Sequence, residues 1–416
     1  MSSTAGAEVL DHSAIAAQFP FLTEAGGADA PLAYLDSGAT AQKPQVVLDA
    51  LRDHLAAHNA NVHRGVYPLA AESDSLYENA RRRIAERFGR TPQETVFTKN
   101  ATEAVNLVAK SWGRANLGPG DLIVTTVMEH HANIVPWQML RDQLGCELGW
   151  VEVDSEGRLD MDSFHSLMER GPKLVAFTHV SNVLGTINPV IDLCERARAA
   201  GAVTVVDGCQ AVPQMACADE AAAADFYIFT GHKIYGPTGI GVLLGRRELL
   251  AAMPPFLGGG DMILTVSRER AVWNELPFKF EAGTPPFAEA SALAVAFDWL
   301  DGLGLEAVRA HEHSLVERTL SAMADLPWVT VHGPPDADSR GALVTFSVEG
   351  VHPHDVAEIL GRSGVCVRAG HHCAGPLMDQ LGVGATTRAS FAVHNGPEDV
   401  DRLIAALHEV RRIFGD

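Results

Sequence analysis

The sequence predicts an α/β protein with a mostly parallel sheet covered by helices, followed by a smaller α+β domain. Apolar runs such as VTVVD (203–207) and FYIFT (226–230) alternate with helical stretches such as DLCERARAAG (192–201). These runs are apolar on both faces, which is typical of parallel strands buried between two layers of helices. Near residue 300 the pattern changes to antiparallel-looking strands with helices around them.

The elements before and between these runs follow from the same periodicities. Residues 1–30 are small and polar and predict a short helix and a lead-in. Helices are predicted at 76–88 and 103–112, with a short strand at 95–97 between them. Further strands are predicted, in chain order, at 122–127, 148–153, 174–180 and 241–245.

The chain is long enough for two domains, since it has 416 residues. A long helical tract at 288–325 precedes the antiparallel-looking runs VTVHG, ALVTFSV and VCVRAG. We therefore expect a large domain at 31–300 and a small domain at 301–416, which carries the loop around Cys373. The N-terminal segment, 1–30, is expected to pack with the small domain.

Composition excludes several classes of function. The formal net charge is -20, which makes nucleic acid and anionic membrane surfaces poor partners. No apolar run approaches the ~18 residues of a membrane-spanning helix, and the first thirty residues do not resemble an export signal. The six cysteines form no CxxC pair, so we expect free thiols in a reducing cytoplasm.

A lysine at the end of a strand is the first candidate for chemistry. In FYIFTGHKIYGPTGIG (226–241) a strand ends at Thr230, and a small turn presents His232 and Lys233. Placing a charged amine at the edge of an apolar sheet is costly. A Schiff base with an aldehyde cofactor would explain it. A surface lysine in a glycine-rich loop is the alternative.

Other strand ends hold residues that suit the same cofactor. Asp207 ends VTVVD and is suited to pair with a protonated pyridine nitrogen, although an aspartate in a turn is the commoner role. Gln210 follows and is suited to a phenolic oxygen. The string TKNATEAVNL (98–107) runs from a loop into a helix, where backbone amides and Thr102 would suit a phosphate. Plain capping of that helix by Asn100 or Thr102 remains the alternative.

The chain resembles the group II cysteine desulfurases, the SufS family, which belong to the fold-type I enzymes that use pyridoxal 5'-phosphate. The matching strings occur in order from about 34 to 394. They are YLDSGAT, NVHRGVY, MEHHANIVPWQ, SNVLGT, VDGCQ, TGHKIYGPTG, FEAGTP and VRAGHHCAGPL. Two positions depart from the familiar pattern: Tyr67 stands where many relatives have a histidine, and SGAT (37–40) replaces NAAT.

The resemblance implies a set of cofactor contacts. Lys233 would bind the cofactor covalently and then move protons, and His130 would stack on the ring and act in acid–base steps. Its neighbour His131 is assigned a structural role. A further set would hold the ring atoms and the phosphate: Asp207, Gln210, Thr102, Thr230 and His232. Thr284 would reach the phosphate bound by the other subunit, so the resemblance implies a homodimer.

The same resemblance implies contacts with the substrate, L-cysteine. Asn182 and Arg388 would bind its carboxylate, for which an arginine fork is well suited. Arg368 would line the site near the thiol. Cys373, flanked by Gly370 and Gly375, would accept the sulfur as its thiolate.

Other roles for the cysteine loop and its neighbours are weaker. His371, His372 and Cys373 are adjacent and cannot easily converge on one ion, so no metal is expected in the enzyme alone. His352 and His354 are two residues apart, so their side chains could share a face and bind zinc. The alternative is that they belong to a polar loop before a helix. Cys209 lies in the VDGCQ string, but the resemblance gives it no chemical role.

The resemblance implies that the protein converts L-cysteine to L-alanine and forms a persulfide on Cys373. This persulfide would supply sulfur for iron-sulfur cluster assembly. The implied sulfur acceptor is a small protein of the zinc-bearing SufU kind, or of the SufE kind. His354 would bind the zinc of a SufU-like acceptor. Alternatives are a selenocysteine lyase, an aminotransferase or epimerase on the same fold, and a catalytically silent scaffold.

Overall fold

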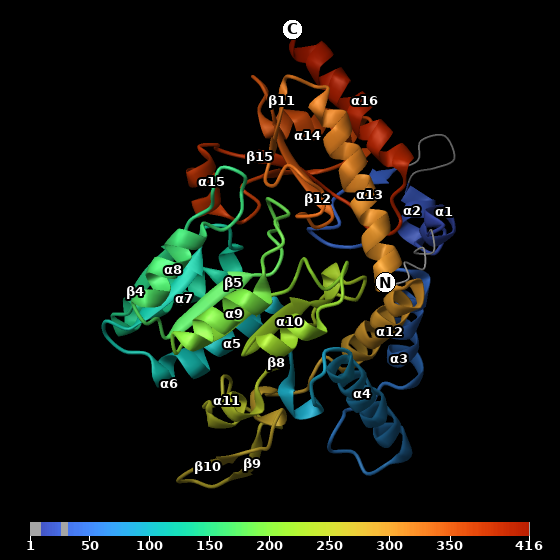
Figure 1. Ribbon diagram of the computed structural model, residues 1–416. Helices are drawn as coiled ribbons and strands as arrows, with labels where there is room; N and C mark the ends of the chain where they lie inside the picture. The colour runs from blue at the N-terminus through green and yellow to red at the C-terminus, as the bar shows by residue number, and fades with distance from the viewer. Residues whose placement is uncertain (1–9, 26–31, 416) are drawn as a thin grey trace, which may run out of the picture.

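The computed structural model describes residues 10–25 and 32–415. A large α/β part carries a smaller C-terminal part above it (Figure 1). The predicted fold class is confirmed: a mixed, mostly parallel sheet with helices, plus a C-terminal domain. Among the described residues, no helix is both long enough and apolar enough to cross a membrane.

The large sheet has seven strands in the order β2-β8-β7-β6-β5-β3-β4. Their bounds are β2 Thr95–Thr98, β3 Leu122–Thr126, β4 Glu147–Val151, β5 Leu174–Thr178, β6 Val203–Asp207, β7 Phe226–Thr230 and β8 Gly241–Gly245. Five neighbouring strands run parallel, and β8 alone is antiparallel to both of its neighbours. The apolar runs predicted at 203–207, 226–230 and 241–245 match β6, β7 and β8 residue for residue.

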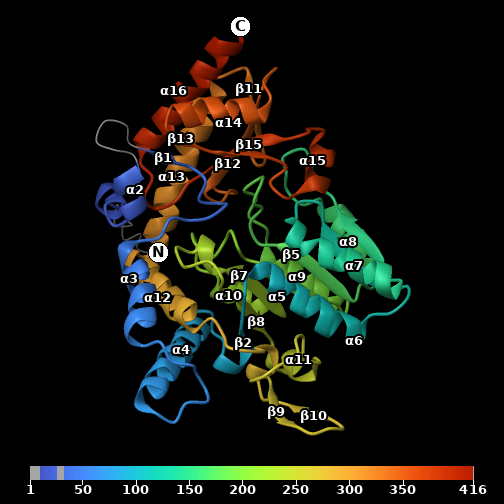
Figure 2. The ribbon, with the colours of Figure 1, turned by 180° about the vertical axis from the view of Figure 1, so that it is seen from behind.

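Successive residues of each strand face opposite layers, so the sheet is buried on both sides. Val205 belongs to one apolar cluster and Val206 to the other. On one side the sheet packs against α5 (Ala101–Val108) and α7 (Val135–Leu144), seen best in Figure 2. On the other side lie α4 (Pro68–Arg87), α8 (Met161–Glu169), α9 (Val190–Ala199) and α12 (Phe287–Leu303).

Three predicted helices differ from those observed. The helix predicted at 76–88 is α4, which begins eight residues earlier at Pro68 and ends at Arg87. The helix predicted at 103–112 ends as an α-helix at Val108 and continues as a π-helical turn, Ala109–Gly113. The tract predicted at 288–325 is two helices, α12 and α13 (Leu305–Ala324). They are separated at Gly304, whose φ of +79° is unfavourable for a residue with a side chain.

The C-terminal domain is an antiparallel sheet with helices around it. The order is β11-β12-β15-β14, with bounds β11 Val329–His332, β12 Leu343–Val348, β14 Arg368–Gly370 and β15 Thr386–Ser390. The helices are α14 (Pro353–Arg362), α15 (Gly375–Leu381) and α16 (Pro397–Phe414). Strand β15 was not among the predicted strands. Its five residues are buried, but Thr, Arg and Ser give no apolar signal.

The segment after residue 31 joins the C-terminal domain rather than the large sheet. Strand β1 (Ala33–Tyr34) pairs in parallel with β13 (Val365–Cys366), and Asp36 bridges to Ser390. Ala33 and Leu35 are fully buried in the apolar core of that domain. The two parts of the molecule are therefore connected both at this segment and through α13.

The N-terminal segment forms two short helices, α1 (His12–Ala16) and α2 (Pro20–Ala25). His12 bonds to Glu398 of α16 at 3.0 Å, whereas Phe19 is buried in the core of the large domain. The segment thus touches both domains, and the boundaries near 30 and 300 stay predictions. The remaining elements are α3 (Gln45–Ala57), α6 (Arg114–Asn116), α10 (Ala218–Ala223), α11 (Arg247–Ala252) and the hairpin β9 (Ile263–Val266) and β10 (Ala271–Trp273).

Candidate active site

The carboxyl ends of the parallel strands open into a cavity of about 190 Å³. Loops that follow β2, β3, β5, β6 and β7 reach it from the large domain, and β14, β15 and the Cys373 loop reach it from the C-terminal domain. It brings together eleven of the predicted site residues: Thr102, His130, Asn182, Asp207, Gln210, Thr230, His232, Lys233, Arg368, Cys373 and Arg388. Thr284 and His354 do not line it, and both are exposed.

Lys233 is presented by a short 3-10 turn, Gly231–Lys233, directly after β7. The turn is held from outside, because the carbonyl of His232 accepts hydrogen bonds from the Ala41 N–H at 3.0 Å and from Lys43 Nζ at 3.2 Å. Gly236 packs against Gly231, where a Cβ would lie 3.0 Å from the Gly231 carbonyl oxygen. The backbone therefore fixes where the lysine enters the cavity.

Asp207 and Gln210 follow β6, the strand next to β7. Asp207 is 7% exposed, and its Oδ1 accepts a hydrogen bond from the Cys209 N–H at 2.9 Å. Gln210 donates from Nε2 to the Gly38 carbonyl at 2.8 Å. A buried carboxylate at the end of a strand costs desolvation, so it is suited to face a cation.

His130 follows β3 and is neutral at physiological pH. Burial, and then the nearby positive charge of Lys233, lowers the pKa of His130 to about 4. Its Nδ1 accepts a hydrogen bond from the Ala132 N–H at 3.1 Å, which fixes the ring and places the proton on Nε2. An uncharged imidazole with this tautomer is suited to stack on an aromatic ring and to donate a hydrogen bond.

One end of the cavity is suited to a phosphate. The side chain of Asn100 caps α5 by accepting from the Glu103 N–H at 2.9 Å, and Ala101 and Thr102 in the first turn line the cavity. The Thr230 hydroxyl is buried and has no hydrogen-bond partner among the residues that the structure describes, an arrangement that a bound group would satisfy. Gly241 backs this end, because a Cβ there would lie 2.4 Å from the Asn100 carbonyl carbon.

Two arginines enter from the C-terminal domain. Arg388 of β15 is 2% exposed, and it donates to the Asn182 carbonyl at 2.8 Å and to Asp36 Oδ1 at 3.2 Å. Arg368 of β14 is half-buried. Burial lowers the pKa of Arg388, while the Asp36 carboxylate opposes that shift. A carboxylate bound beside these guanidinium groups would offset their desolvation.

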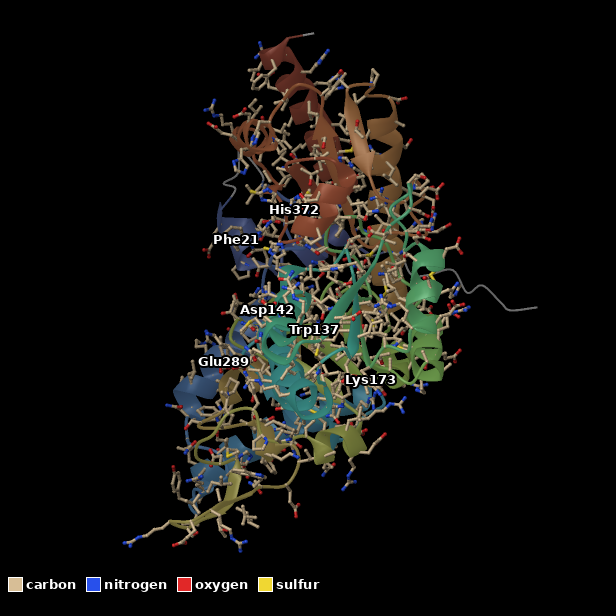
Figure 3. The ribbon with its side chains drawn as sticks, turned by 90° about the vertical axis from the view of Figure 1, so that its left-hand side faces the viewer. Phe21, Trp137, Asp142, Lys173, Glu289 and His372 are labelled. Carbon is tan, nitrogen blue, oxygen red and sulfur yellow. The ribbon has the colours of Figure 1, made fainter. Side chains whose placement is uncertain are left out.

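The Cys373 loop has an unusual backbone. His372 and Cys373 both have positive φ, +51° and +57°, a region that non-glycine residues seldom occupy. His372 is 3% exposed and its Nε2 lies 3.0 Å from Thr386 Oγ1; Figure 3 labels it. Cys373 itself is half-buried and lines the cavity. The thiol is thus held in a strained turn over the strand ends.

Four residues near the site were not predicted as site residues: Asp36, Glu129, His131 and His372. Asp36 lies inside the string YLDSGAT and Glu129 inside MEHHANIVPWQ. Their place in these two strings was the sequence signal that could have identified them as site residues. Glu129 is fully buried under His130, and it accepts hydrogen bonds from Thr126, Asn133 and Thr178. Burial raises its pKa to about 8.

The chain belongs to the aminotransferase class-V family, whose model matches residues 33–403. A cysteine desulfurase of Haloferax volcanii is 46% identical over 97% of this chain and 98% of the relative. A probable cysteine desulfurase of Streptomyces coelicolor is 46% identical over 98% and 99%. The apo structure of a cysteine desulfurase from Thermococcus onnurineus matches with a TM-score of 0.92 and 39% identity, over 98% of this chain and 100% of that chain.

Within that family the chain falls among the cysteine desulfurases, which use pyridoxal phosphate. The predicted enzyme class and cofactor are therefore confirmed. The cavity fits that cofactor, because it offers a lysine, a buried carboxylate and an unpartnered hydroxyl beside a helix N-terminus. The individual roles of the residues remain predictions.

Proposed function

We propose that this chain transfers the sulfur of L-cysteine to Cys373 and releases L-alanine. The observation that carries the proposal is that Lys233 and Cys373, from different domains, line one cavity together with Asp207, His130 and Arg388. Each of these side chains has a use in this reaction, and a protein without catalytic activity has no physical need of all five.

Pyridoxal phosphate would be held by residues of the large domain. When bound, it supplies an electron sink that is conjugated to Cα of the amino acid. Lys233 would anchor it, Asp207 would keep a proton on the pyridine nitrogen, and Gln210 would bond to the ring oxygen. Thr102, Thr230 and His232 would bind the phosphate. Burial lowers the pKa of His232 to about 4, so it would act there as a neutral donor.

The substrate carboxylate would lie between the two domains. Arg388 is already fixed by Asn182 and Asp36, so it offers a preorganised guanidinium. Arg368 would add a second positive charge, and Asn182 would bind the carboxylate together with Arg388. This contact orients Cα toward Lys233, whose amine takes the Cα proton.

Sulfur transfer is then a displacement at the substrate sulfur. The Cys373 thiolate attacks that sulfur, an S–S bond forms and the Cβ–S bond breaks. The electron pair of the broken bond stays with the carbon fragment. The substrate sulfur gives up its own proton as it becomes the outer sulfur of the persulfide on Cys373. The proton held by Lys233 returns to the fragment, and one further proton, equivalent to the one lost from the substrate thiol, adds at Cβ, which gives L-alanine. The Arg388 guanidinium is close enough to Cys373 to interact with it electrostatically.

The subfamily, the oligomeric state and the cellular compartment are proposed from the sequence strings quoted above and from the exposure of Thr284. We assign the chain to the group II, SufS-like enzymes that supply iron-sulfur cluster assembly, acting as a cytoplasmic homodimer. Thr284 is exposed and outside the cavity, as a residue that serves the other subunit would be. All six cysteines are free thiols, which fits a reducing compartment. The selenium analogue of the substrate would meet the same contacts.

The sulfur acceptor is proposed to dock near α14. His352 caps this helix and His354 lies in its first turn, and both are exposed, with ring centroids 5.1 Å apart. An exposed neutral imidazole is a good zinc ligand. A zinc-bearing acceptor of the SufU kind is therefore favoured over one of the SufE kind.

One assay tests the proposed function. Purified protein should be yellow and should form alanine from L-cysteine, with sulfide released when a reductant is present. Alanine and sulfide should appear in equal amounts. Absence of alanine from the wild-type holoenzyme, with or without an acceptor protein, would contradict the proposal.

A further inference from the structure

His131 makes two hydrogen bonds to the loop of the sulfur-accepting cysteine, one at Cys373 itself and one at Gly375, two residues further along the chain. The backbone N–H of His131 donates to the carbonyl of Cys373 at 2.7 Å. The ring nitrogen Nε2 of His131 accepts a hydrogen bond from the backbone N–H of Gly375 at 2.9 Å. A backbone N–H can only donate, so Nε2 must be the unprotonated nitrogen of a neutral ring. Residues 131 and 375 are 244 positions apart in the sequence, so these contacts join the two domains.

The turn that these bonds hold is strained. His372 and Cys373 occupy the left-handed region, at a cost of order 1 kcal/mol each or more for non-glycine residues. Such a conformation persists only where surrounding contacts determine it. Three sets of contacts do so: the bonds to His131, the bond that Asn182 Nδ2 donates to the carbonyl of His372 at 2.8 Å, and the contact of His372 Nε2 with Thr386 Oγ1 at 3.0 Å.

We propose that His131 is a positioning residue that clamps the Cys373 loop over the cavity and opens when its ring is protonated. This inference rests on the proposed function of Cys373 and goes beyond it by assigning the device that sets the position of the sulfur. His131 follows directly on His130, which lines the cavity. One short backbone segment, which leads into the 3-10 turn His131–Asn133, therefore holds both the ring-facing histidine and the sulfur loop.

Protonation would remove the clamp because Nε2 would then present a proton to the N–H of Gly375. The charged and titratable groups around His131 are His130, His371 and Cys373. Burial, and then His371, lowers the pKa of His131 below its ordinary value of 6.5. The clamp is therefore closed at neutral pH and loosens as the pH falls through that lowered pKa.

The test follows access to Cys373 in the purified holoenzyme, without turnover. The rate of modification of Cys373 by a dithiodipyridine reagent is measured by peptide mapping from pH 5 to pH 8. Loss of one hydrogen bond of about 1 kcal/mol corresponds to a roughly fivefold faster reaction in His131→Ala at pH 8. The ratio of variant to wild type should fall towards one as the pH falls through the lowered pKa of His131, because wild type then loses the same bond.

Two further variants make the result specific. His131→Gln keeps an accepting oxygen that does not titrate, so it should stay close to wild type at pH 8 and remain slow at pH 5. His371→Ala changes an exposed neighbour in the same loop and should leave the rate at pH 8 unchanged, although the clamp should then loosen at a higher pH because His371 no longer lowers the pKa of His131. At pH 8, an unchanged rate in His131→Ala, or an equal increase in His371→Ala, would overturn the proposal. Alanine formation is assayed separately. A failure of the proposed desulfurase function would therefore appear in that assay and not in the rate of Cys373 modification.

Discussion

Arg368 and Arg388 lie directly opposite each other on the antiparallel strands β14 and β15. Like charges at such positions destabilise a sheet unless an anion lies between or beside them. Of these two arginines, Arg388 forms an ion pair with Asp36, at 3.2 Å. The pair therefore leaves positive charge on the wall of the cavity, which suits the carboxylate of an amino-acid substrate.

The first prediction concerns that carboxylate. Arg388→Lys should keep the charge but lose the fork that bonds to Asn182 and Asp36. We expect kcat/KM for L-cysteine to fall about a hundredfold, the scale of a lost charged hydrogen-bonded contact. The same change at the exposed Arg362, which pairs with Glu358 on its own helix, should leave kcat/KM within twofold, about 0.4 kcal/mol. Equal effects at both positions would argue against substrate binding by Arg388.

The second prediction concerns the cofactor. Lys233→Ala should fold and still hold pyridoxal phosphate through the remaining contacts, but borohydride should not fix the cofactor covalently to the protein. Mass spectrometry of the intact chain after reduction measures this. Lys173→Ala, at an exposed lysine that precedes β5 at its amino end and does not line the cavity, serves as the control and should be labelled like wild type. A reduced cofactor adduct on the Lys233→Ala chain would identify another lysine as the anchor.

The third prediction concerns the sulfur. Cys373→Ser should bind L-cysteine and change the cofactor spectrum, yet carry no persulfide and form alanine at less than about one hundredth of the wild-type rate. Cys366→Ser tests a half-buried thiol on β13 and should keep the persulfide on Cys373. Burial raises the pKa of both Cys366 and the fully buried Cys209, which makes them poor nucleophiles. Extra sulfur mapped to either residue would refute the assignment.

The fourth prediction concerns stability and pH. Glu312 of α13 is buried, and one of its carboxyl oxygens lacks a partner; burial raises its pKa to about 8, against the opposing charge of Arg309. The folded protein therefore holds a proton that the unfolded chain releases above about pH 4.5. Stability from this group is present below that pH and is lost as the pH rises towards 8.

Glu312→Gln removes this dependence. Its urea midpoint relative to wild type should rise between pH 5 and pH 8, by an amount equivalent to about 1–3 kcal/mol. Glu317→Gln, at an exposed position on the same helix, should show no such change. A constant difference between Glu312→Gln and wild type across this range would show that the carboxyl is ionised throughout.

The fifth prediction concerns the acceptor. His354→Ala should leave basal alanine formation near that of wild type, because His354 is exposed and outside the cavity. Stimulation by a zinc-bearing acceptor of the SufU kind should be abolished, since the acceptor's zinc loses its incoming ligand. Alanine formation is measured against acceptor concentration, with the exposed His408→Ala as the control. If the acceptor stimulated His354→Ala and wild type equally, His354 would not be a zinc ligand and would be only a polar residue at the start of α14.

Local pattern was sufficient for the strands that are apolar throughout. Strands β6 and β7 were predictable to the residue, and with them the positions of Asp207 and Lys233 at or just after their ends. Parallel strands bring their carboxyl ends to one edge, so the meeting of these two residues also followed from the sequence. Strand β15 was missed because Arg388 and its neighbours are polar, although all are buried.

The sequence by itself determined the fold class, the reaction class and the residue types of the cavity, because these depend on local periodicity and on strings of adjacent residues. Only the tertiary structure decided that Arg368 faces Arg388, that Asp36 joins the C-terminal domain, and that His131 clamps the Cys373 loop. These contacts join residues that lie far apart in the chain or on separate strands. Their geometry comes from strand register and domain packing, which a single sequence does not encode in any local pattern.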